Sequence, residues 1–440
     1  MKKAFIVQSS RLLPGLSGLF LERRWTRERI EAFQTERLRA LVRHAYSRVP
    51  YYRRLFDQAG LSPDRIRTLE DLRKIPFTTR AMLQALPEGD IIARGFNPQT
   101  LVVHRTSGST GEPFSIRRTR WEDRLLQAYR LSVLFRFGLR ITDRRAAVVT
   151  RRLVGTPLYM RSGMLRYEEV HCLLPAAQIL SRLRQIQPDV LRGYPGTLSY
   201  LAGLMTDSDR ERIRPRLITT DSEMMTSDMR ARISAAFQAR VVDFYDSHEF
   251  NMIAWECPSS GLYHVSDASM IAEVISDGRA VEPNREGELV GTALHSWAMP
   301  FIRFRLGDLV TRGPDRCPCG VQYSVVTGVQ GRVADRFELP GRSIHPYTLV
   351  SSLLAQGRWI RQYQIVQERS DLVKVKLVAL PGASPSPEAI AGVRQVLGER
   401  LGKDVQIEVE LVALIPPGSN GKFRPYYSML TAPSGSFSHQ

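Results

Sequence analysis

The chain has 440 residues, of which 43% are hydrophobic and 8% aromatic, so it can bury a sizeable core and its composition argues against global disorder. The net charge of +18 favours contact with polyanions or a membrane surface, or reflects a solvated arginine-rich surface. No stretch approaches the roughly 20 apolar residues of a transmembrane helix, and no nucleic-acid-binding motif is present. Four cysteines are too few for a disulfide scaffold. We expect a cytoplasmic protein of two or three domains.

Residues 1–100 are predicted to be mainly helical. Apolar side chains recur at helical spacing from Thr26 to Tyr46. Val49-Pro50 interrupts this pattern, and Gly60 is placed to end the short helix that follows. The segment from Leu12 to Trp25 is apolar with basic flanks. We favour a packed or frayed N-terminus for it over contact with a membrane surface.

Between about residues 100 and 250, buried strands alternate with amphipathic helices. We expect strands at 145–150, 189–192, 216–220 and 240–245, and helices at 121–137, 175–186, 198–205 and 227–237. Such strand–helix–strand units predict a largely parallel sheet with helices on its faces. Ligands bind these sheets beyond the carboxyl ends of the strands.

The remainder of the chain has a different pattern. Residues 250–335 are richer in antiparallel strands and turns. Beyond residue 335 a small α+β unit is predicted, with strands at 362–367, 372–380 and 405–414 and a helix at 387–401. The small polar residues at 433–440 are typical of a disordered end.

The loop from Thr106 to Pro113 is the most informative stretch for function. It lies between predicted strands at 101–104 and 114–117 and contains Thr106, Ser107, Gly108, Ser109, Thr110 and Gly111. Glycines let the backbone approach a ligand closely, and successive N–H groups and hydroxyls can surround phosphate oxygens. A polar hairpin turn has the same composition. The loop matches neither the Walker P-loop nor the dinucleotide fingerprint.

This loop resembles the phosphate-binding signature of adenylate-forming enzymes, in particular the phenylacetate-CoA ligase and CapK-like branch. Four further stretches resemble the same family in the same order, namely residues 245–249, 303–309, 331–335 and 420–424. The resemblance covers nearly the whole chain. It implies an α/β fold with a large N-terminal domain of mostly parallel sheets and a small α+β C-terminal lid. Residues 101–335 would then form the ATP- and substrate-binding core, and residues 336–440 a mobile lid.

The resemblance implies binding roles around a nucleotide. Tyr245 would lie against adenine, with the weaker match Ser222-Glu223 lining the same site. Asp308 would bind the ribose hydroxyls, since a carboxylate suits a vicinal diol, and Arg332 would contact phosphate. Without the resemblance, these acids would be ordinary solvated side chains or turn residues.

The resemblance also implies that Lys422, Glu249 and Thr110 take part in catalysis. Lys422 would enter the site on the lid and stabilise the negatively charged transition state. Glu249 would bind Mg²⁺, which prefers a few carboxylate oxygens together with phosphates and water. Asp335 would be the hinge acid between the large domain and the lid. Closure of the lid would complete the site and exclude water.

The sequence departs from the family pattern at four places. Glu112 stands where the phosphate loop often has a lysine. Asp246 replaces a glycine after Tyr245, and His248 replaces a hydroxyl residue. Ala334 replaces the first of two adjacent acids at the hinge. These departures keep open a second hypothesis, a nucleotide-binding relative that has lost catalysis.

Three cysteines and one histidine form a second set of candidate residues. Cys257 and His264 lie seven apart, and Cys317 and Cys319 follow in a Cys-Pro-Cys-Gly sequence. Three thiolates and one imidazole are the donor set of a closed, structural Zn²⁺ site, and the setting at 255–320 resembles zinc-bearing relatives. Free core thiols are the alternative. Cys172 is expected to be a buried apolar residue.

Together these features predict ATP-dependent activation of a carboxylic acid as acyl-AMP, with release of pyrophosphate. Transfer to the thiol of coenzyme A or of an acyl or peptidyl carrier protein would follow. An amine or hydroxyl acceptor, or simple adenylyl transfer, stays open. The acid is not specified, but residues between about 130 and 250 should line its pocket, with Tyr194 and Phe244 as candidate walls. The sequence leaves open whether the protein is a homodimer.

Overall fold

The computed structural model describes residues 25–105, 114–150, 165–356, 359–380, 382–418 and 422–430. Several sequence predictions therefore lie outside the described residues. These are the phosphate loop with Glu112, nearly all of the segment from Leu12 to Trp25, Asn420-Gly421 beside the predicted catalytic lysine, and the polar end at 433–440. The side chain of Ala334 is also outside the description.

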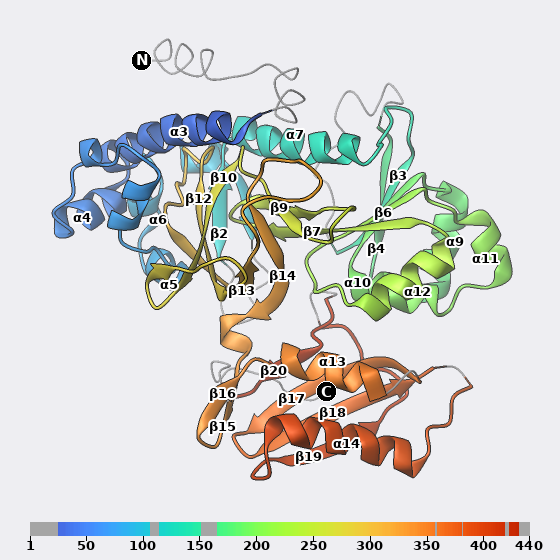
Figure 1. The fold of residues 1–440 in the computed structure, drawn as a ribbon. Coiled ribbons are helices and arrows are strands. Elements are labelled where there is room, and N and C mark those ends of the chain that lie inside the picture. Colours follow the sequence, from blue (N-terminus) through green and yellow to red (C-terminus); the bar gives the residue numbers. More distant parts are fainter. Residues whose placement is uncertain are drawn as a thin grey trace.

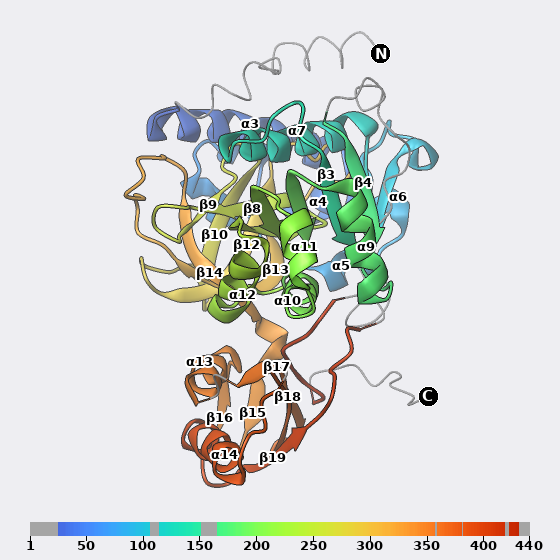
Figure 2. The ribbon, with the colours of Figure 1, turned by 90° about the vertical axis from the view of Figure 1, so that its right-hand side faces the viewer.

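The chain forms a large body and a smaller C-terminal domain. Figures 1 and 2 show the C-terminal domain below the body in two perpendicular views, joined to it after β14. Long helices α3 and α7 lie on the opposite side of the body. Within the described ranges, no helix is both long and apolar enough to cross a membrane.

The N-terminal part is helical in residues 27–91. Helix α3 starts after Thr26, whose side chain accepts a hydrogen bond from the Arg29 N–H. Pro50 begins α4 directly after α3, because proline fits the first turn of a helix. The α-helices of this part are α3 Arg27–Arg48, α4 Pro50–Gln58, α5 Arg80–Gln84 and α6 Glu88–Ile91.

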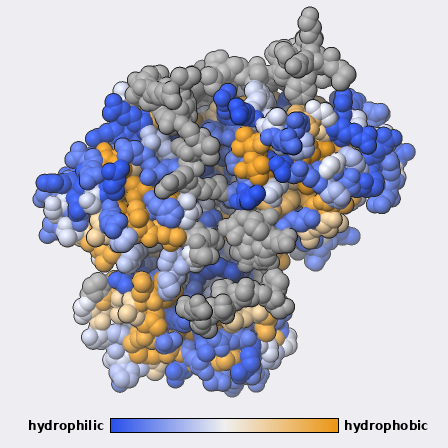
Figure 3. All heavy atoms as spheres, turned by 180° about the vertical axis from the view of Figure 1, so that it is seen from behind, coloured by the Kyte–Doolittle hydropathy of each residue, from blue (hydrophilic) through white to orange (hydrophobic). Residues whose placement is uncertain are grey.

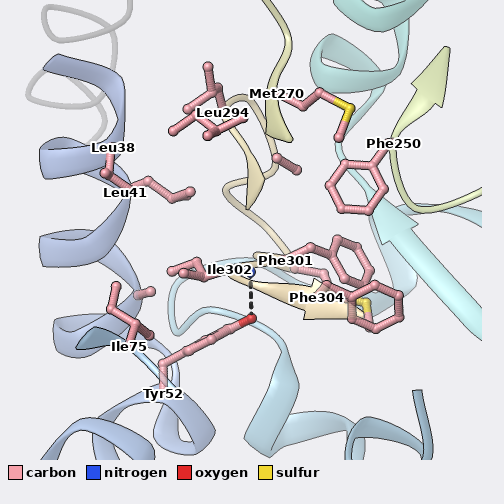
Figure 4. Close-up of a cluster of buried hydrophobic side chains, with 14 of the residues drawn as sticks. Leu38, Leu41, Tyr52, Ile75, Phe250, Met270, Leu294, Phe301, Ile302 and Phe304 are labelled. Carbon is pink, nitrogen blue, oxygen red and sulfur yellow. Dashed lines mark hydrogen bonds between the residues drawn. The ribbon is translucent and has the colours of Figure 1, made fainter. Parts of the chain in front are cut away.

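These helices pack on the antiparallel half of the sheet. Leu38 and Leu41 of α3 face the segment that carries Phe301 and Phe304, as Figure 4 shows. The Tyr52 hydroxyl accepts a hydrogen bond from the Ile302 N–H at 2.9 Å within this apolar cluster. The cluster fixes the N-terminal helices on residues 294–304, which lead into the predicted nucleotide motif at 303–309.

A hairpin and a long helix follow. Strands β1 Val102–Arg105 and β2 Ser115–Arg118 are antiparallel and flank the predicted phosphate loop. Helix α7 Arg120–Arg136 starts with a capping box between Thr119 and Glu122. Helix α7 faces the sheet and supplies Arg130 to the site described below.

The central feature is a twelve-stranded sheet in the order β11-β10-β12-β13-β14-β9-β8-β7-β6-β5-β3-β4. Its parallel half runs from β4 to β7, as the alternation of strands and helices predicts. The strands of this half are β3 Arg145–Val149, β4 Tyr167–His171, β5 Val190–Gly193, β6 Leu217–Thr220 and β7 Arg240–Ser247. The helices are α9 Ala176–Ile186, α10 Pro195–Ala202, α11 Asp207–Arg212 and α12 Ser227–Phe237.

From β7 onward the sheet is antiparallel. Strand β7 pairs with β6 in parallel and with β8 in antiparallel fashion, so it joins the two halves. The strands of the second half are β8 Asn251–Glu256, β9 Tyr263–Val265, β10 Met270–Ser276, β11 Arg279–Ala280, β12 Glu286–Ala293, β13 Phe304–Arg312 and β14 Val325–Arg332.

The C-terminal domain contains a four-stranded sheet in the order β19-β18-β17-β20, covered by two helices. Its elements are β15 Phe337–Leu339, β16 Arg342–Ile344, α13 Tyr347–Gln356, β17 Ile360–Arg369, β18 Leu372–Ala379, α14 Pro387–Leu401, β19 Gln406–Leu411 and β20 Tyr426–Ser428. Viewed from behind, the surface of the body and of this domain is mostly hydrophilic, and its apolar patches are separated by polar side chains (Figure 3).

Candidate active site

The predicted adenine and ribose residues lie in contact at the junction of the two half-sheets. The Tyr245 hydroxyl, at the end of β7, donates a hydrogen bond to Asp308 Oδ2 at 2.5 Å. Asp308 and Arg332 are partners in the β13–β14 register, and Arg332 Nε lies 3.7 Å from Asp308 Oδ1. Burial raises the pKa of Asp308, although the charge of Arg332 and the hydrogen bond from Tyr245 oppose the rise. The structure thus brings three predicted nucleotide residues together.

Glu249, the predicted magnesium ligand, follows β7 and is 3% exposed. Its Oε1 accepts a hydrogen bond from the Arg80 guanidinium at 3.0 Å. Arg118 of β2 donates to the backbone carbonyls of His248 at 2.5 Å and Glu249 at 2.9 Å. The hairpin that flanks the phosphate loop therefore fixes the backbone that carries Glu249.

A largely buried network of four charged side chains lies at the carboxyl ends of β5, β6 and β7. Arg192 of β5 donates two hydrogen bonds to Asp221, at 2.6 and 3.0 Å. Arg130 of α7 donates to Asp221 at 2.8 Å and also pairs with Asp246 Oδ2. Although burial opposes it, the charges of Arg192 and Arg130 lower the pKa of Asp221. Asp246, one of the departures from the family pattern, is thus part of an ion-pair network.

Lys422, the predicted catalytic lysine, reaches this same edge from the C-terminal domain. Its Nζ lies 5.6 Å from the ring centroid of Tyr194, which directly follows β5. The Tyr194 hydroxyl is 3.0 Å from Thr150 Oγ1. Phe244, the other predicted pocket wall, is 1% exposed and packs against Phe137, so its contact with an acid stays a prediction.

Glu223 joins the large body to the segment Lys422–Arg424 of the C-terminal domain, called the lysine loop below. Its Oε1 accepts the Phe423 N–H at 2.7 Å, and its Oε2 accepts the Gly196 N–H at 2.8 Å. Burial raises the pKa of Glu223 to about 7, although these two N–H groups and the charge of Lys422 oppose the rise. Ser222 has a positive φ of 70° and donates to Asp221 Oδ1 at 3.0 Å. The adenine role of Ser222 and Glu223 stays a prediction.

The predicted hinge lies between β14 and β15. Asp335 accepts a hydrogen bond from Arg424 at 2.8 Å, which links the hinge to the lysine loop. Gly331 has a φ of 127°, and a Cβ there would lie 2.5 Å from the Tyr426 hydroxyl and 2.7 Å from His345 Cε1. Only glycine combines this backbone conformation with such close packing.

The three cysteines and the histidine of the second candidate set converge on one point. Their four donor atoms all lie within 4.8 Å of one another. Cys257 Sγ and Cys317 Sγ are 3.7 Å apart, and Cys319 Sγ is 3.2 Å from His264 Nε2. Burial and the charge of Arg136 lower the pKa of His264 to about 4, so the imidazole is neutral, as a metal ligand must be.

These spacings are close to those of a tetrahedral metal centre. Ligand bonds of about 2.3 Å for sulfur and about 2.0 Å for nitrogen place two sulfur donors roughly 3.8 Å apart and a sulfur and a nitrogen roughly 3.5 Å apart, so the cysteine pair has this spacing and the cysteine–histidine pair is shorter by about 0.3 Å. Burial opposes ionisation of Cys257, but hydrogen bonds from Ser260 and the Ser259 backbone outweigh it and lower its thiol pKa to about 7. Cys172 is 9% exposed and lies in an apolar cluster of the parallel half-sheet.

Several site residues were not predicted from the sequence. These are Arg80, Arg130, Arg192 and Asp221, each of which acts through a contact between separate elements. Arginine is frequent along the chain, and none of these arginines stands in a distinctive pattern. Asp221 could have been found from its position, because it directly follows a buried strand and precedes Ser222-Glu223.

Comparison with known proteins agrees with this geometry. Residues 340–427 match the family model for the CapK C-terminal domain. The phenylacetate-coenzyme A ligase of Thermus thermophilus is 25% identical over 434 residues, which cover 89% of this chain and 94% of that protein. A 2-hydroxyisobutyryl-CoA ligase, solved in the postadenylation state with R3-HIB-AMP, has a TM-score of 0.76 at 22% identity, covering 90% of this chain and 89% of that one.

The same 2-hydroxyisobutyryl-CoA ligase, solved with 2-HIB-AMP and CoA in the thioesterification state, gives a TM-score of 0.63 with the same coverage. Over the whole chain, the structure is thus more similar to the postadenylation structure. The family resemblance predicted from the motifs is confirmed. The chain is a homologue of the phenylacetate-CoA ligases, carries a CapK C-terminal domain and has the fold of the adenylate-forming CoA ligases.

Proposed function

We propose that the chain is an acid–thiol ligase that activates a carboxylic acid with ATP and transfers the acyl group to coenzyme A. In the first step a carboxylate oxygen attacks the α-phosphorus, acyl-AMP forms and pyrophosphate leaves. In the second step the coenzyme A thiolate attacks the acyl carbonyl and AMP leaves. The observation that carries the proposal is that Lys422 lies over Tyr194 at the carboxyl end of β5, in the same parallel half-sheet whose strand β7 carries Tyr245, in contact with Asp308, and leads to Glu249.

Each of these residues has a defined part in the first step. Asp308 accepts hydrogen bonds from the ribose hydroxyls, and Tyr245 orients that carboxylate and lies against adenine. The ammonium group of Lys422 stabilises the charge that develops during attack. Glu249 holds Mg²⁺, which offsets the charge of the triphosphate. The loop from Thr106 to Gly111, which includes Thr110, would bind the phosphates, and Arg332 would contact them.

The cluster of Cys257, His264, Cys317 and Cys319 holds a structural Zn²⁺ ion. All four ligands come from the protein, so no coordination position is left for a substrate, and a closed site of this kind stabilises the fold. The ion would join the turn after β8, strand β9 and the loop before β14.

The acyl acceptor follows from charge and from the relatives. A net charge of +18 favours an anionic acceptor, and coenzyme A carries several phosphate charges. The relatives and structural neighbours cited above are coenzyme A ligases. Transfer to a carrier protein, to an amine or to a hydroxyl group is distinguished from transfer to coenzyme A by the experiment below.

The test is ATP-dependent pyrophosphate release with a panel of aryl, fatty, amino and hydroxy acids, followed by product analysis with and without coenzyme A. Release with one acid class and formation of an acyl-CoA are expected. Acyl-AMP that reacts only with a carrier protein or an amine would contradict the coenzyme A step. ATP binding without pyrophosphate release with any acid would favour the non-catalytic nucleotide-binding relative.

A further inference from the structure

The charged network beside the lysine loop contains one oxygen atom that has no partner. Asp221 accepts hydrogen bonds from Arg192, Arg130 and Ser222 through its two oxygens. Asp246 pairs with Arg130 through Oδ2 alone. Its Oδ1 is buried and accepts no hydrogen bond. Among the residues that the structure describes, no other buried carboxylate oxygen lacks a hydrogen-bond partner.

This atom lies between the residues assigned to the nucleotide and the predicted catalytic lysine. Asp246 immediately follows Tyr245, whose hydroxyl contacts the ribose-binding carboxylate. Its network partner Arg192 lies two residues before Tyr194, the residue under Lys422. Strands β5, β6 and β7 are neighbours in the parallel half-sheet, so the network lies between the nucleotide residues and the lysine. About a third of the Arg192 side chain is exposed (32%), so the network is not sealed on that side.

The charges in the network balance, which restricts what it can accept. Two arginines face two aspartates, and the arginine charges are already paired. A second carboxylate on the substrate would therefore find no free cation among these four side chains. A wholly apolar acyl group would leave Asp246 Oδ1 desolvated and unpaired, which is unfavourable. A neutral or cationic hydrogen-bond donor satisfies the atom without disturbing the other pairs.

We propose that Asp246, held by Arg130, is a specificity-determining residue of the acyl pocket, and that its Oδ1 accepts a hydrogen bond from a hydroxyl or amino group on the acid substrate. This inference rests on the proposed acid-activating function. It assigns a substrate class, acids that carry a donor group on the acyl chain. Acids of the same shape without a donor are rejected, because a site built to pair a polar group is left with an unpaired atom.

The experiment compares matched acids on the full-length wild-type protein by pyrophosphate release at saturating ATP. One series is butanoate, 3-hydroxybutanoate and 3-aminobutanoate. The other is phenylacetate, 4-hydroxyphenylacetate and 4-aminophenylacetate. The measured quantity is the ratio of kcat/KM for each donor-bearing acid to that for its donor-free parent. We expect a ratio of at least about tenfold for one donor-bearing acid. The hydroxyl and amino members show which donor the site takes.

The matched variant is Asp246→Asn. Its control is Asp315→Asn, because the Asp315 side chain is 78% exposed and pairs with Arg312, which is not part of this network. Arg130 would hold the amide oxygen, so the amide NH₂ group would replace Oδ1 and face the substrate donor. For the amino member of each series the ratio should then fall to about one in Asp246→Asn, because the two N–H donors face each other. A substrate hydroxyl could still accept from the amide NH₂ group, and the control should leave every ratio unchanged. A merely structural role would lower kcat/KM for donor-bearing and donor-free acids by the same factor.

The outcomes separate this inference from the proposed function. Equal or better turnover of the donor-free acids by the wild-type protein would overturn the role of Asp246 and leave acid activation intact, and this result needs no variant. A tenfold preference for an amino member that persists in folded Asp246→Asn would also overturn it. Pyrophosphate release with none of these acids, nor with any acid of the wider panel, would defeat the proposed function and this inference together.

Discussion

Glu223 Oε1 accepts the backbone N–H of Phe423 at 2.7 Å, across a sequence separation of 200 residues. Phe423 directly follows Lys422, so this contact fixes the backbone from which the lysine extends. Met225, two residues after Glu223, packs with Phe423 in an apolar cluster that also contains Met229 and Ile415. The docked position of the lysine loop is therefore specified by the segment after β6.

Replacing Glu223 by glutamine should weaken this docking. A glutamine oxygen can accept one of the two N–H groups, but its NH₂ group would face the other donor. Losing one such bond costs on the order of 1 kcal/mol or more, so we expect pyrophosphate release to slow by about tenfold. Transfer of a supplied acyl-AMP to coenzyme A should change little if the lid leaves this contact for the second step. Equal losses in both half-reactions would contradict a contact specific to adenylation.

Lys422→Ala should slow pyrophosphate release by roughly 100-fold or more, because the variant removes a charge that stabilises the transition state. ATP binding, measured by calorimetry, should change much less. Lys403→Ala is the matched control, since Lys403 is an exposed lysine of the same domain. Wild-type rates in Lys422→Ala would remove this lysine from the mechanism.

The metal prediction is one Zn²⁺ per chain in protein purified without chelators. Cys319→Ser should lose most of the metal and lower the melting temperature, because the closed site contributes to folding. Cys172→Ser is a suitable control, since Cys172 is also buried but lies in a different cluster. Mass spectrometry of the native protein and metal analysis provide the measurement. Full metal content in Cys319→Ser would contradict the assigned ligand set.

Asp243 should make stability depend on pH. It lies in β7, and its two oxygens accept hydrogen bonds from Thr220 at 2.5 Å and Tyr263 at 2.9 Å. Burial raises the pKa of Asp243 to about 7, above its ordinary value of about 3.9. The folded state therefore holds a proton that the unfolded state releases between these values. The stability linked to this proton is fully present below about pH 4 and is lost as pH rises to about 7.

Asp243→Asn should remove this dependence, because the amide can accept from Thr220 and donate to Tyr263 at any pH. The free energy of unfolding of Asp243→Asn relative to wild type should rise between pH 4 and 7 and level off above pH 7. At about 1.4 kcal/mol per pKa unit, the rise should amount to a few kcal/mol. Denaturant unfolding at several pH values measures it, with exposed Asp64→Asn as the control. A constant difference between Asp243→Asn and wild type would show that Asp243 does not titrate in this range.

Most regular elements of the parallel half-sheet could be predicted because they carry periodic patterns, but β4 and α11 were missed and the helix expected at 198–205 spans Pro195–Ala202. Helix α12 spans Ser227–Phe237, the residues predicted for it, and β6 differs from its prediction by one residue. Elements with weaker patterns were missed. Strand β20 has three residues and is defined by its pairing with β17. Helix α13 is a short apolar run, which does not distinguish a helix from a strand.

Site residues followed the same division. Tyr245, Asp308, Lys422 and the cysteines stand in motifs with fixed spacing, so the sequence was enough to propose them as site residues, and their roles stay predictions. The contacts of Asp246 could not be, because they depend on Arg130, which lies 116 residues away on a helix that crosses the sheet. Charge pairing between distant elements leaves no local periodicity, and the sequence shows Asp246 only as a departure from a pattern.

Strand β7 belongs to both halves of the sheet, since it pairs with β6 on one side and β8 on the other. The residues that follow it, including Glu249, therefore depend on both halves for their position. Local opening of either half would distort the nucleotide site, so a bound nucleotide should slow amide hydrogen exchange in both β6 and β8. Ligand binding at this one strand would then couple the unfolding of two structurally different halves of the domain.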